Sequence, residues 1–287
     1  MIIDKLYEEV KNKGPVCLGL DTAVEYIPEG ILKSCSSAFD AVLKFNKGII
    51  DATIDVVSCY KVQIAYYEAM GLKGMEVYKN TLEYIRSHGA VAIADIKRGD
   101  IAKTAEMYAK AHFEGDFESD FVTLNPYMGL DGIEPYLPYV EKSEKGLFVL
   151  VRTSNKGAED IEYIETKDND RVYNVVGKKL HDLGNKYMGS CGYNSIGGVI
   201  GCTHIEEGME LRNNLDKMFF LIPGYGAQGG KAEDVALYLK NGNGGVVNSS
   251  RGILLAYKKS EGLDFAEAAR MEAIRMREDI LKYVKVF

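Results

Sequence analysis

Charged side chains that could do chemistry are densest in the segment ADIKRGDIAKT, residues 94–104. Asp95 and Lys97 are two residues apart, so within a β-strand both side chains project to the same side. Lys61 lies in an earlier run of β-forming residues and would join them if the two strands are neighbours. Burying a charge costs several kcal/mol unless the charge is well paired. A cluster of two lysines and an aspartate therefore indicates a functional site.

A purely structural interpretation of the same residues stays open. Asp95 and Lys97 could form an ordinary ion pair at the rim of the fold, and Lys61 could extend its stem over apolar surface towards water. Asp100 could be the N-cap of a helix that begins at Ile101. Capping and catalysis do not exclude one another at this position.

Lys97 is expected to act as an acid rather than as a nucleophile. A lysine forms a Schiff base only when its amine is neutral, which needs desolvation or a nearby cation. Lys97 instead has Asp95 and Asp100 on its two sides in sequence, and opposite charges favour the ammonium form. A held ammonium can stabilise negative charge on a reacting carbon and then deliver a proton. Beside Asp95, a substrate carboxylate would be repelled, and its loss as CO2 would relieve that repulsion.

Two loops near the end of the chain predict a phosphate site. PGYGAQGG, residues 223–230, and NSSRG, residues 248–252, each follow an apolar run. Glycines let backbone N–H groups approach an anion, and a following helix offers its N-terminus. Arg251 can bind phosphate oxygens with two hydrogen bonds. In the simpler alternative, the glycines only form tight turns and Arg251 lies on the surface.

Eight short apolar or β-branched runs alternate with segments of helical periodicity, which predicts an α/β fold. The expected strands are residues 16–21, 56–63, 91–97, 121–125, 147–153, 197–201, 218–224 and 244–250. The expected helices are an amphipathic N-terminal one and residues 39–54, 75–87, 101–114, 171–188, 206–215, 232–240 and 265–283. Apolar strands joined by helical crossovers favour a closed (β/α)8 TIM barrel, with an open doubly wound sheet as the alternative.

No linker or low-complexity segment divides the chain, so we expect a single barrel domain over residues 1–287. In such a barrel the chemistry takes place at the carboxyl-terminal ends of the strands. The polar residues expected there are Asp21, Lys61, Gln63, Asp95, Lys97, Asn125, Thr153 and Ser154. Two longer excursions, residues 22–34 and 155–170, would belong to the same rim.

Composition excludes several classes of protein. The chain has 35 basic and 42 acidic residues, a net charge of −7, and no basic tract, so nucleic acid and anionic membranes are poor partners. Its five cysteines include no C-x-x-C pair, which suits reduced thiols and a cytoplasmic location. No run reaches about 18 apolar residues. The four histidines are scattered, so no metal site built from histidine is expected.

The order of these motifs resembles that of the orotidine 5'-phosphate decarboxylase family, in its longer form with a KRGDI signature. The motifs are CLGLD, YKVQ, DIKRGDIAKTA, LNPYMG, VRTSN, PGYGAQGG and NSSRG, and the resemblance spans residues 16–252. It implies decarboxylation of orotidine 5'-monophosphate to uridine 5'-monophosphate in de novo pyrimidine biosynthesis, without a metal or other cofactor.

The resemblance also implies a role for each matching residue. Lys61, Asp95, Lys97 and Asp100 would form a charged network, in which Lys97 protonates C6 of the carbanion left by CO2. The chain would form a homodimer, with Asp100, Ile101 and Thr104 completing the partner subunit's site. The other substrate contacts would be Asp21 and Lys61 at the ribose, Ser154 and Pro223 at the pyrimidine, and Gly224, Gln228, Gly229, Ser250 and Arg251 at the phosphate.

Two positions depart from the family pattern. Proline is common in the family after the aspartate of the first strand, where this chain has Thr22. Proline is also common in the loop after the pyrimidine-contacting serine, where this chain has Lys156. Neither departure removes a named catalytic group, but both fall in the rim loops.

Three other functions remain open. A magnesium-dependent decarboxylase of keto-sugar phosphates would need carboxylates free to bind metal, and chelator would abolish its activity. A Schiff-base aldolase acting on a sugar phosphate would be trapped on Lys97 by borohydride. A non-catalytic phosphometabolite-binding barrel would bind its ligand tightly without turnover.

Overall fold

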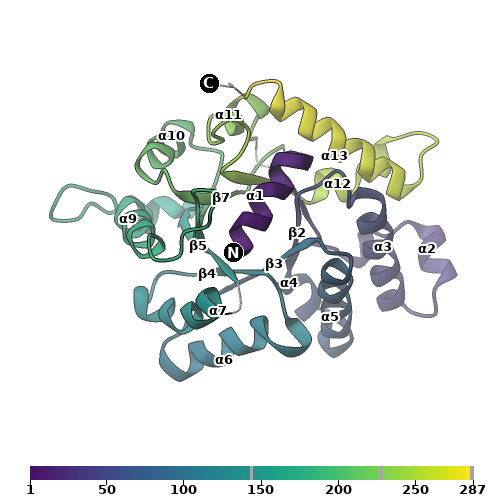
Figure 1. Ribbon diagram of the computed structural model, residues 1–287. Helices are drawn as coiled ribbons and strands as arrows, with labels where there is room; N and C mark the ends of the chain where they lie inside the picture. The colour runs from purple at the N-terminus through teal and green to yellow at the C-terminus, as the bar shows by residue number, and fades with distance from the viewer. Residues whose placement is uncertain (143–144, 227–228, 285–287) are drawn as a thin grey trace.

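The eight strands form a closed parallel barrel in sequence order (Figure 1). The computed structural model describes residues 1–142, 145–226 and 229–284. Strand β8 pairs with β1, so the predicted TIM barrel is confirmed and the open doubly wound sheet is excluded. The strands are β1 (Val16–Gly19), β2 (Cys59–Gln63), β3 (Val91–Arg98), β4 (Phe121–Leu124), β5 (Gly146–Arg152), β6 (Asn194–Ile200), β7 (Met218–Ile222) and β8 (Gly245–Ser249). Their residues are almost all buried, as expected when helices cover the outside of a parallel sheet.

Helices follow the strands around the outside of the barrel. They are α1 (Ile2–Lys13), α2 (Glu29–Ser34), α3 (Ala38–Thr53), α4 (Ile64–Glu68), α5 (Gly71–Ser87), α6 (Ala102–Phe113), α7 (Leu137–Lys142), α8 (Glu159–Glu162), α9 (Val172–Gly184), α10 (Ile205–Asn214), α11 (Ala232–Ala236), α12 (Arg251–Leu254) and α13 (Phe265–Leu281). None of the helices that the structure describes has the length and apolarity needed to cross a membrane.

All eight strands and all the expected helices are present, and only some bounds were predicted wrongly. Helix α11 ends at Ala236 rather than at Lys240, because the following backbone N–H groups bond three residues back in tight turns. Helix α9 ends at Gly184 because residue 188 pairs with residue 194 at the entry to β6. The excursion at 22–34 contains α2, and the one at 155–170 contains α8.

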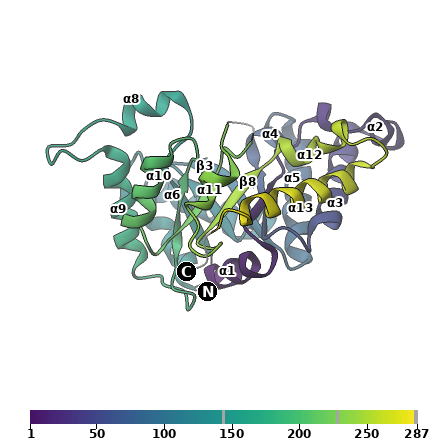
Figure 2. The same ribbon diagram turned by 90° about the horizontal axis from the view of Figure 1, so that it is seen from above.

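The amino-terminal mouth of the barrel is closed by helix α1. This helix buries Ile2, Ile3, Leu6 and Val10 against the side chains that fill the barrel. Those side chains form an apolar inner cluster that contains Cys17, Cys59, Val91, Ile93, Phe121, Phe148, Val199, Phe219, Leu221 and Val246. Figure 2 shows α1 at one end of the barrel and α8 at the other. The carboxyl-terminal mouth therefore remains available for a site.

The last helix of the chain packs against the first part of the barrel wall. The rings of Phe45 on α3 and Phe265 on α13 stack with their centroids 4.9 Å apart. The carboxylate of Asp264 caps α13 by accepting hydrogen bonds from the backbone N–H groups of residues 266 and 267. The guanidinium of Arg270 binds the Asp55 carboxylate at 2.8 Å. These contacts complete the ring of helices where the end of the chain meets its beginning.

The inner cluster leaves no room for an added methyl group at Gly197 in β6. A Cβ atom there would lie 2.6 Å from Cδ1 of Phe148 and 2.6 Å from the carbonyl oxygen of Phe219. Because overpacking a core is destabilising, we expect Gly197→Ala to lower the free energy of unfolding by about 1–3 kcal/mol in urea denaturation. Gly30→Ala is the control, since nothing lies within 4 Å of a Cβ at that exposed helical position. An equal loss in both variants would contradict the prediction.

Candidate active site

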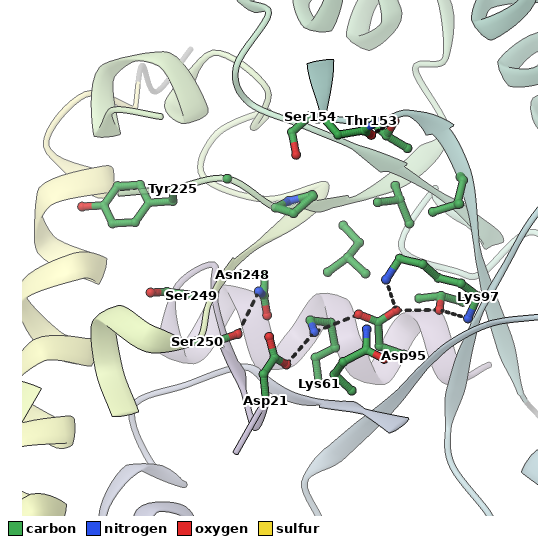
Figure 3. A pocket seen from close by; sticks show the side chains of 18 of the residues that line it. Asp21, Lys61, Asp95, Lys97, Thr153, Ser154, Tyr225, Asn248, Ser249 and Ser250 are labelled. Atoms are coloured by element: carbon green, nitrogen blue, oxygen red, sulfur yellow. Dashed lines mark hydrogen bonds and ion pairs between the residues drawn. The ribbon is translucent and has the colours of Figure 1, made fainter. Parts of the chain in front are cut away.

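Four charged side chains form a row of alternating sign at the carboxyl-terminal mouth of the barrel (Figure 3). Lys61 donates to Oδ1 of Asp21 at 3.1 Å and to Oδ2 of Asp95 at 2.9 Å. Lys97 donates to the other oxygen of Asp95, Oδ1, at 2.6 Å. These residues come from the end of β1 and from strands β2 and β3, where the sequence predicted polar residues at the mouth of the barrel.

The middle of this row is almost fully buried. The side chains of Lys61 and Asp95 are each 6% exposed, whereas that of Lys97 is 46% exposed. The alternative that Lys61 extends towards water is therefore wrong. Burial opposes the charge on Asp95, but Lys61 and then Lys97 outweigh it and hold the pKa of this carboxyl well below its usual range. Burial likewise opposes the charge on Lys61, but Asp21 and Asp95 raise its pKa above the ordinary value.

Thr123 on β4 fixes the backbone that carries Lys97. Its hydroxyl donates to Oδ1 of Asp95 at 2.8 Å and accepts from the backbone N–H groups of Ile96 and Lys97, each at 2.9 Å. Lys97 has a φ of 45°, which residues with a side chain rarely adopt, and the β3–β4 register shifts at this point. Sequence reasoning missed Thr123. The signal was present in the sequence, because Thr123 is a lone polar residue between the apolar Val122 and Leu124 of the expected strand.

The charged row lines one wall of a pocket of about 420 Å3. Its size lies within the range of small-molecule sites, roughly 300–1,000 Å3. Part of the lining is apolar. It includes Leu150, Val199, Leu221 and Pro223, of which Val199 and Leu221 also belong to the inner cluster. A ligand with a charged end and a flat, less polar part would fit this division.

The loops after β7 and β8 line the pocket beyond the charged row. Gly224, Tyr225, Ser250 and Arg251 all belong to the lining. Gly19 on β1 lets Ser250 approach closely, because a Cβ on Gly19 would lie 1.9 Å from the Ser250 hydroxyl oxygen and would force that side chain to move. The side chains of Ser249 and Ser250 lie on the same side of the pocket as Asp21 in Figure 3.

Two predicted phosphate contacts are not placed in this lining. Gly229 lies in the loop after β7 with a φ of 91°, outside the residues that line the pocket. Gln228 lies outside the described residues. Tyr225 in the same loop donates to the Asp279 carboxylate on α13 at 2.9 Å, which ties the loop to the last helix.

Ser154 lines the pocket across from the charged row, after the end of β5 (Figure 3). Arg152, the last residue of β5, is 1% exposed. Its guanidinium donates to Glu207 on α10 at 2.6 Å and to Glu162 on α8 at 3.0 Å. Glu162 also accepts from the backbone N–H and the hydroxyl of Thr153. This ion-pair network, which sequence reasoning missed, holds the rim loop against the end of β5, two residues before Ser154.

Asp100, Ile101 and Thr104 are not brought into the pocket of this subunit. None of them is among the lining residues, Ile101 is 50% exposed, and Thr104 is also exposed. The alternative that Asp100 caps a helix beginning at Ile101 is wrong. Helix α6 begins at Ala102 with no side-chain cap, and Asp100 accepts from the N–H of the adjacent Ile101 at 2.8 Å. Asn125 is likewise not among the lining residues, and it accepts from the Tyr127 N–H at 3.0 Å.

Comparison with known proteins gives concordant results. The model of the orotidine 5'-phosphate decarboxylase / HUMPS family matches residues 14–264. Orotidine 5'-phosphate decarboxylase of Clostridium acetobutylicum is 69% identical over 98% of this chain and 99% of its own length. The protein of the same name from Clostridium kluyveri is 66% identical over 98% of both chains.

Solved structures share the fold as well. The structure of Leishmania donovani OMP decarboxylase matches with a TM-score of 0.76 and 26% identity, over 97% of this chain and 96% of that chain. Leishmania donovani UMP synthase matches with a TM-score of 0.77 and 28% identity, over 96% of this chain and 55% of that longer chain. Sequence and fold agree, and this chain belongs to the orotidine 5'-phosphate decarboxylase / HUMPS family.

Proposed function

We propose that this chain decarboxylates orotidine 5'-monophosphate to uridine 5'-monophosphate in pyrimidine biosynthesis, and that Lys97 donates the proton to C6. The observation that carries the proposal is the alternating row of charges, in which buried Asp95 holds the Lys97 ammonium in the pocket. The names of the Clostridium relatives support the same reaction.

The chemistry follows from where the charges lie. The carboxylate on C6 of the substrate would enter beside Asp95, whose own charge is fixed by two lysines. When the C–C bond breaks, CO2 leaves and the bonding electron pair stays on C6. The Lys97 ammonium stabilises this carbanion and then transfers one proton, so that a C6–H bond forms as an N–H bond breaks. The ammonium is already in place before the reaction, so little reorganisation is needed.

The remaining groups of the pocket would bind the rest of the nucleotide. Arg251 and Ser250, with Gly224 of the other loop, offer donors for a phosphate group. Gly229 and Gln228 of that loop are proposed to join them. Ser154 would contact the pyrimidine, with Pro223 against its face, and Asp21 and Lys61 would hold ribose hydroxyls. Binding energy from the phosphate can then support a reaction at the distant C6.

We also propose a homodimer in which Asp100, Ile101 and Thr104 complete the partner subunit's site. These residues lie beside an exposed apolar surface: Tyr127 and Met128 of the loop after β4 are 80% and 50% exposed. The two loops adjoin, because a Cβ on Gly132 would lie 3.1 Å from the Asp100 carbonyl oxygen and 3.8 Å from Cβ of Met128. Contiguous exposed apolar surface of this kind is typical of interfaces.

Two further expectations remain proposals. Residues 1–287 would form a single domain, because the apolar clusters inside and outside the barrel wall draw on every strand. The enzyme would work in the cytoplasm, in keeping with five free cysteines.

The rival reactions are less well supported by the same geometry. A magnesium-dependent enzyme needs free carboxylates, but Asp21 and Asp95 are both engaged by lysines. Among the described residues, no group of three or more His, Cys, Asp or Glu side chains could hold a metal ion. A Schiff-base aldolase needs a neutral amine, whereas Lys97 forms an ion pair of 2.6 Å.

The direct test follows the absorbance of orotidine 5'-monophosphate with purified protein in the presence of chelator. We expect turnover by the wild-type chain. In Lys97→Ala the rate of turnover should fall by about 10²–10⁴-fold, since the proton donor is removed. Lys73→Ala is the control, because this lysine is 65% exposed and forms a surface ion pair with Glu76. Full activity in Lys97→Ala, or loss of wild-type activity in chelator, would refute the proposal.

Asp95 also predicts how stability depends on pH. Its folded-state pKa lies below the unfolded value of about 3.9, so its contribution to stability is present above that pH and is lost as the pH falls. Below pH 4, wild-type unfolding should take up about one proton more than unfolding of Asp95→Asn. Urea denaturation between pH 2.5 and 7, roughly the range over which such carboxylates titrate, measures how steeply the free energy of unfolding changes with pH in each protein. Identical acid slopes in the two proteins would count against the charged, buried Asp95.

A shared site predicts recovery of activity by mixing two inactive variants. Lys97→Ala and Asp100→Ala should each be nearly inactive, but subunit exchange would form hybrids with one intact site. At equal amounts, about one quarter of the wild-type activity should return, because the two-fold dimer pairs each Lys97 with the partner's Asp100. Mixing Lys97→Ala with Asp95→Ala is the control, since both residues serve the same subunit's site and no activity should return. Absence of recovery in the first mixture would disprove the shared site.

A further inference from the structure

Four polar side chains lie buried directly behind Asp21, outside the pocket. Thr22, Asn46, Tyr67 and Thr81 each have 0% of their surface exposed. They come from the residue after Asp21 and from helices α3, α4 and α5. We call these four side chains the buried polar cluster. Buried polar groups cost stability unless each one is hydrogen bonded, so the cluster needs an explanation.

Asn46 is the centre of the buried polar cluster. Its Oδ1 accepts from the Thr22 hydroxyl at 2.8 Å, and its Nδ2 donates to the Tyr67 hydroxyl at 2.9 Å and to the Thr81 hydroxyl at 3.2 Å. The Thr81 hydroxyl in turn donates to the Val77 carbonyl at 2.7 Å. Three helices are thereby linked to the single residue that follows Asp21. A fully satisfied network of this kind is rigid.

The network holds the chain on both sides of Asp21. On one side, the Tyr67 hydroxyl donates to the Leu20 carbonyl at 3.0 Å, and the Leu20 N–H donates to the Lys61 carbonyl at 2.8 Å. On the other side, Thr22 is held by its hydroxyl bond to the cluster. The side chain of Asp21 is therefore aimed into the pocket by fixed neighbours, and its own bond to Lys61 uses only Oδ1. Its Oδ2 is the oxygen that would accept from a ribose hydroxyl.

We propose that the buried polar cluster, through Thr22, positions Asp21 to bind a ribose hydroxyl and so makes the pocket select ribonucleotides over their deoxy forms. This inference rests on the proposed function, in which Asp21 contacts the ribose. Thr22 stands where proline is common in the family. Proline would restrict the backbone through its ring but carries no hydroxyl, whereas here a hydrogen bond to Asn46 restrains the same position. Thr22, Asn46 and Tyr67 are positioning residues, since they act through Asp21.

The variant Thr22→Val tests the proposal, because it keeps the shape of the side chain and removes the hydroxyl. Binding of uridine 5'-monophosphate and of 2',3'-dideoxyuridine 5'-monophosphate is measured by calorimetry. Wild-type protein should bind the ribonucleotide more tightly. In Thr22→Val its affinity should fall about tenfold, the equivalent of roughly 1.4 kcal/mol, with the dideoxy affinity unchanged. Thr22→Ser keeps the hydroxyl and should restore the preference.

Thr53→Val is the matched control. Thr53 is also 0% exposed and lies on α3 like Asn46. Its hydroxyl donates to the Ile49 carbonyl at 2.7 Å and shares a hydrogen bond of 2.8 Å with the Tyr60 hydroxyl. This variant loses buried hydrogen bonds to Ile49 and Tyr60, which lie outside the buried polar cluster and do not hold Leu20 or Thr22. It should lower the melting temperature while leaving the preference between the two nucleotides unchanged. An equal loss of preference in Thr53→Val, or an equal loss of both affinities in Thr22→Val, would overturn the proposal.

A double-mutant cycle shows whether Thr22 acts through Asp21. In an Asp21→Ala background, Thr22→Val should cause no further change in affinity for the ribonucleotide, because the group it positions is gone. Additive effects would show that Thr22 acts elsewhere and would overturn the proposal. The proposed function fails separately, if the wild-type chain does not turn over orotidine 5'-monophosphate. The nucleotide preference is measured by binding and does not depend on that turnover.

Discussion

The carboxylate of Asp95, buried between two ammonium groups, is the interaction on which the rest of the site depends. Isolated buried ions cost several kcal/mol each, so this carboxylate is tolerated only because Lys61, Lys97 and Thr123 all bind it. Each partner comes from a different place in the barrel wall. The pairing of β2 with β3 and of β3 with β4 must therefore keep its register for the charges to remain compensated. Fold and chemistry share this one constraint.

The row of charges was largely predictable from the sequence, because strand geometry is regular. Asp95 and Lys97 are two residues apart, and Lys61 sits on the preceding strand, so parallel pairing brings them to one end of the barrel. The unusual φ of Lys97 was not predictable. It arises where the β3–β4 register shifts and Thr123 bonds two successive N–H groups. That bonding depends on a neighbouring strand, which no local pattern reveals.

The parts that the sequence did not predict are long-range contacts between ordinary polar residues. Arg152 meets Glu207 across 55 residues, and Thr22 meets Asn46 across 24. Neither pair has a spacing that marks it, and threonine, asparagine and glutamate are common on protein surfaces. Only the folded barrel shows that these side chains are buried. Both contacts restrain rim loops at positions 22 and 152–162, near the two departures from the family pattern, so restraint by proline and restraint by hydrogen bonds are alternative solutions to one problem.

The closed end of the barrel matters to the open end through the inner cluster. Val199 and Leu221 belong to both that cluster and the pocket wall, so apolar packing continues from the charged row to helix α1. A charge interaction is stronger where water is excluded, because the effective dielectric constant is lower. Helix α1 closes the amino-terminal mouth with Ile3 and Leu6, which are 1% and 0% exposed, and so keeps water from reaching the row from below. Helix α1, none of whose residues lines the pocket, thus contributes to the electrostatics that the chemistry needs.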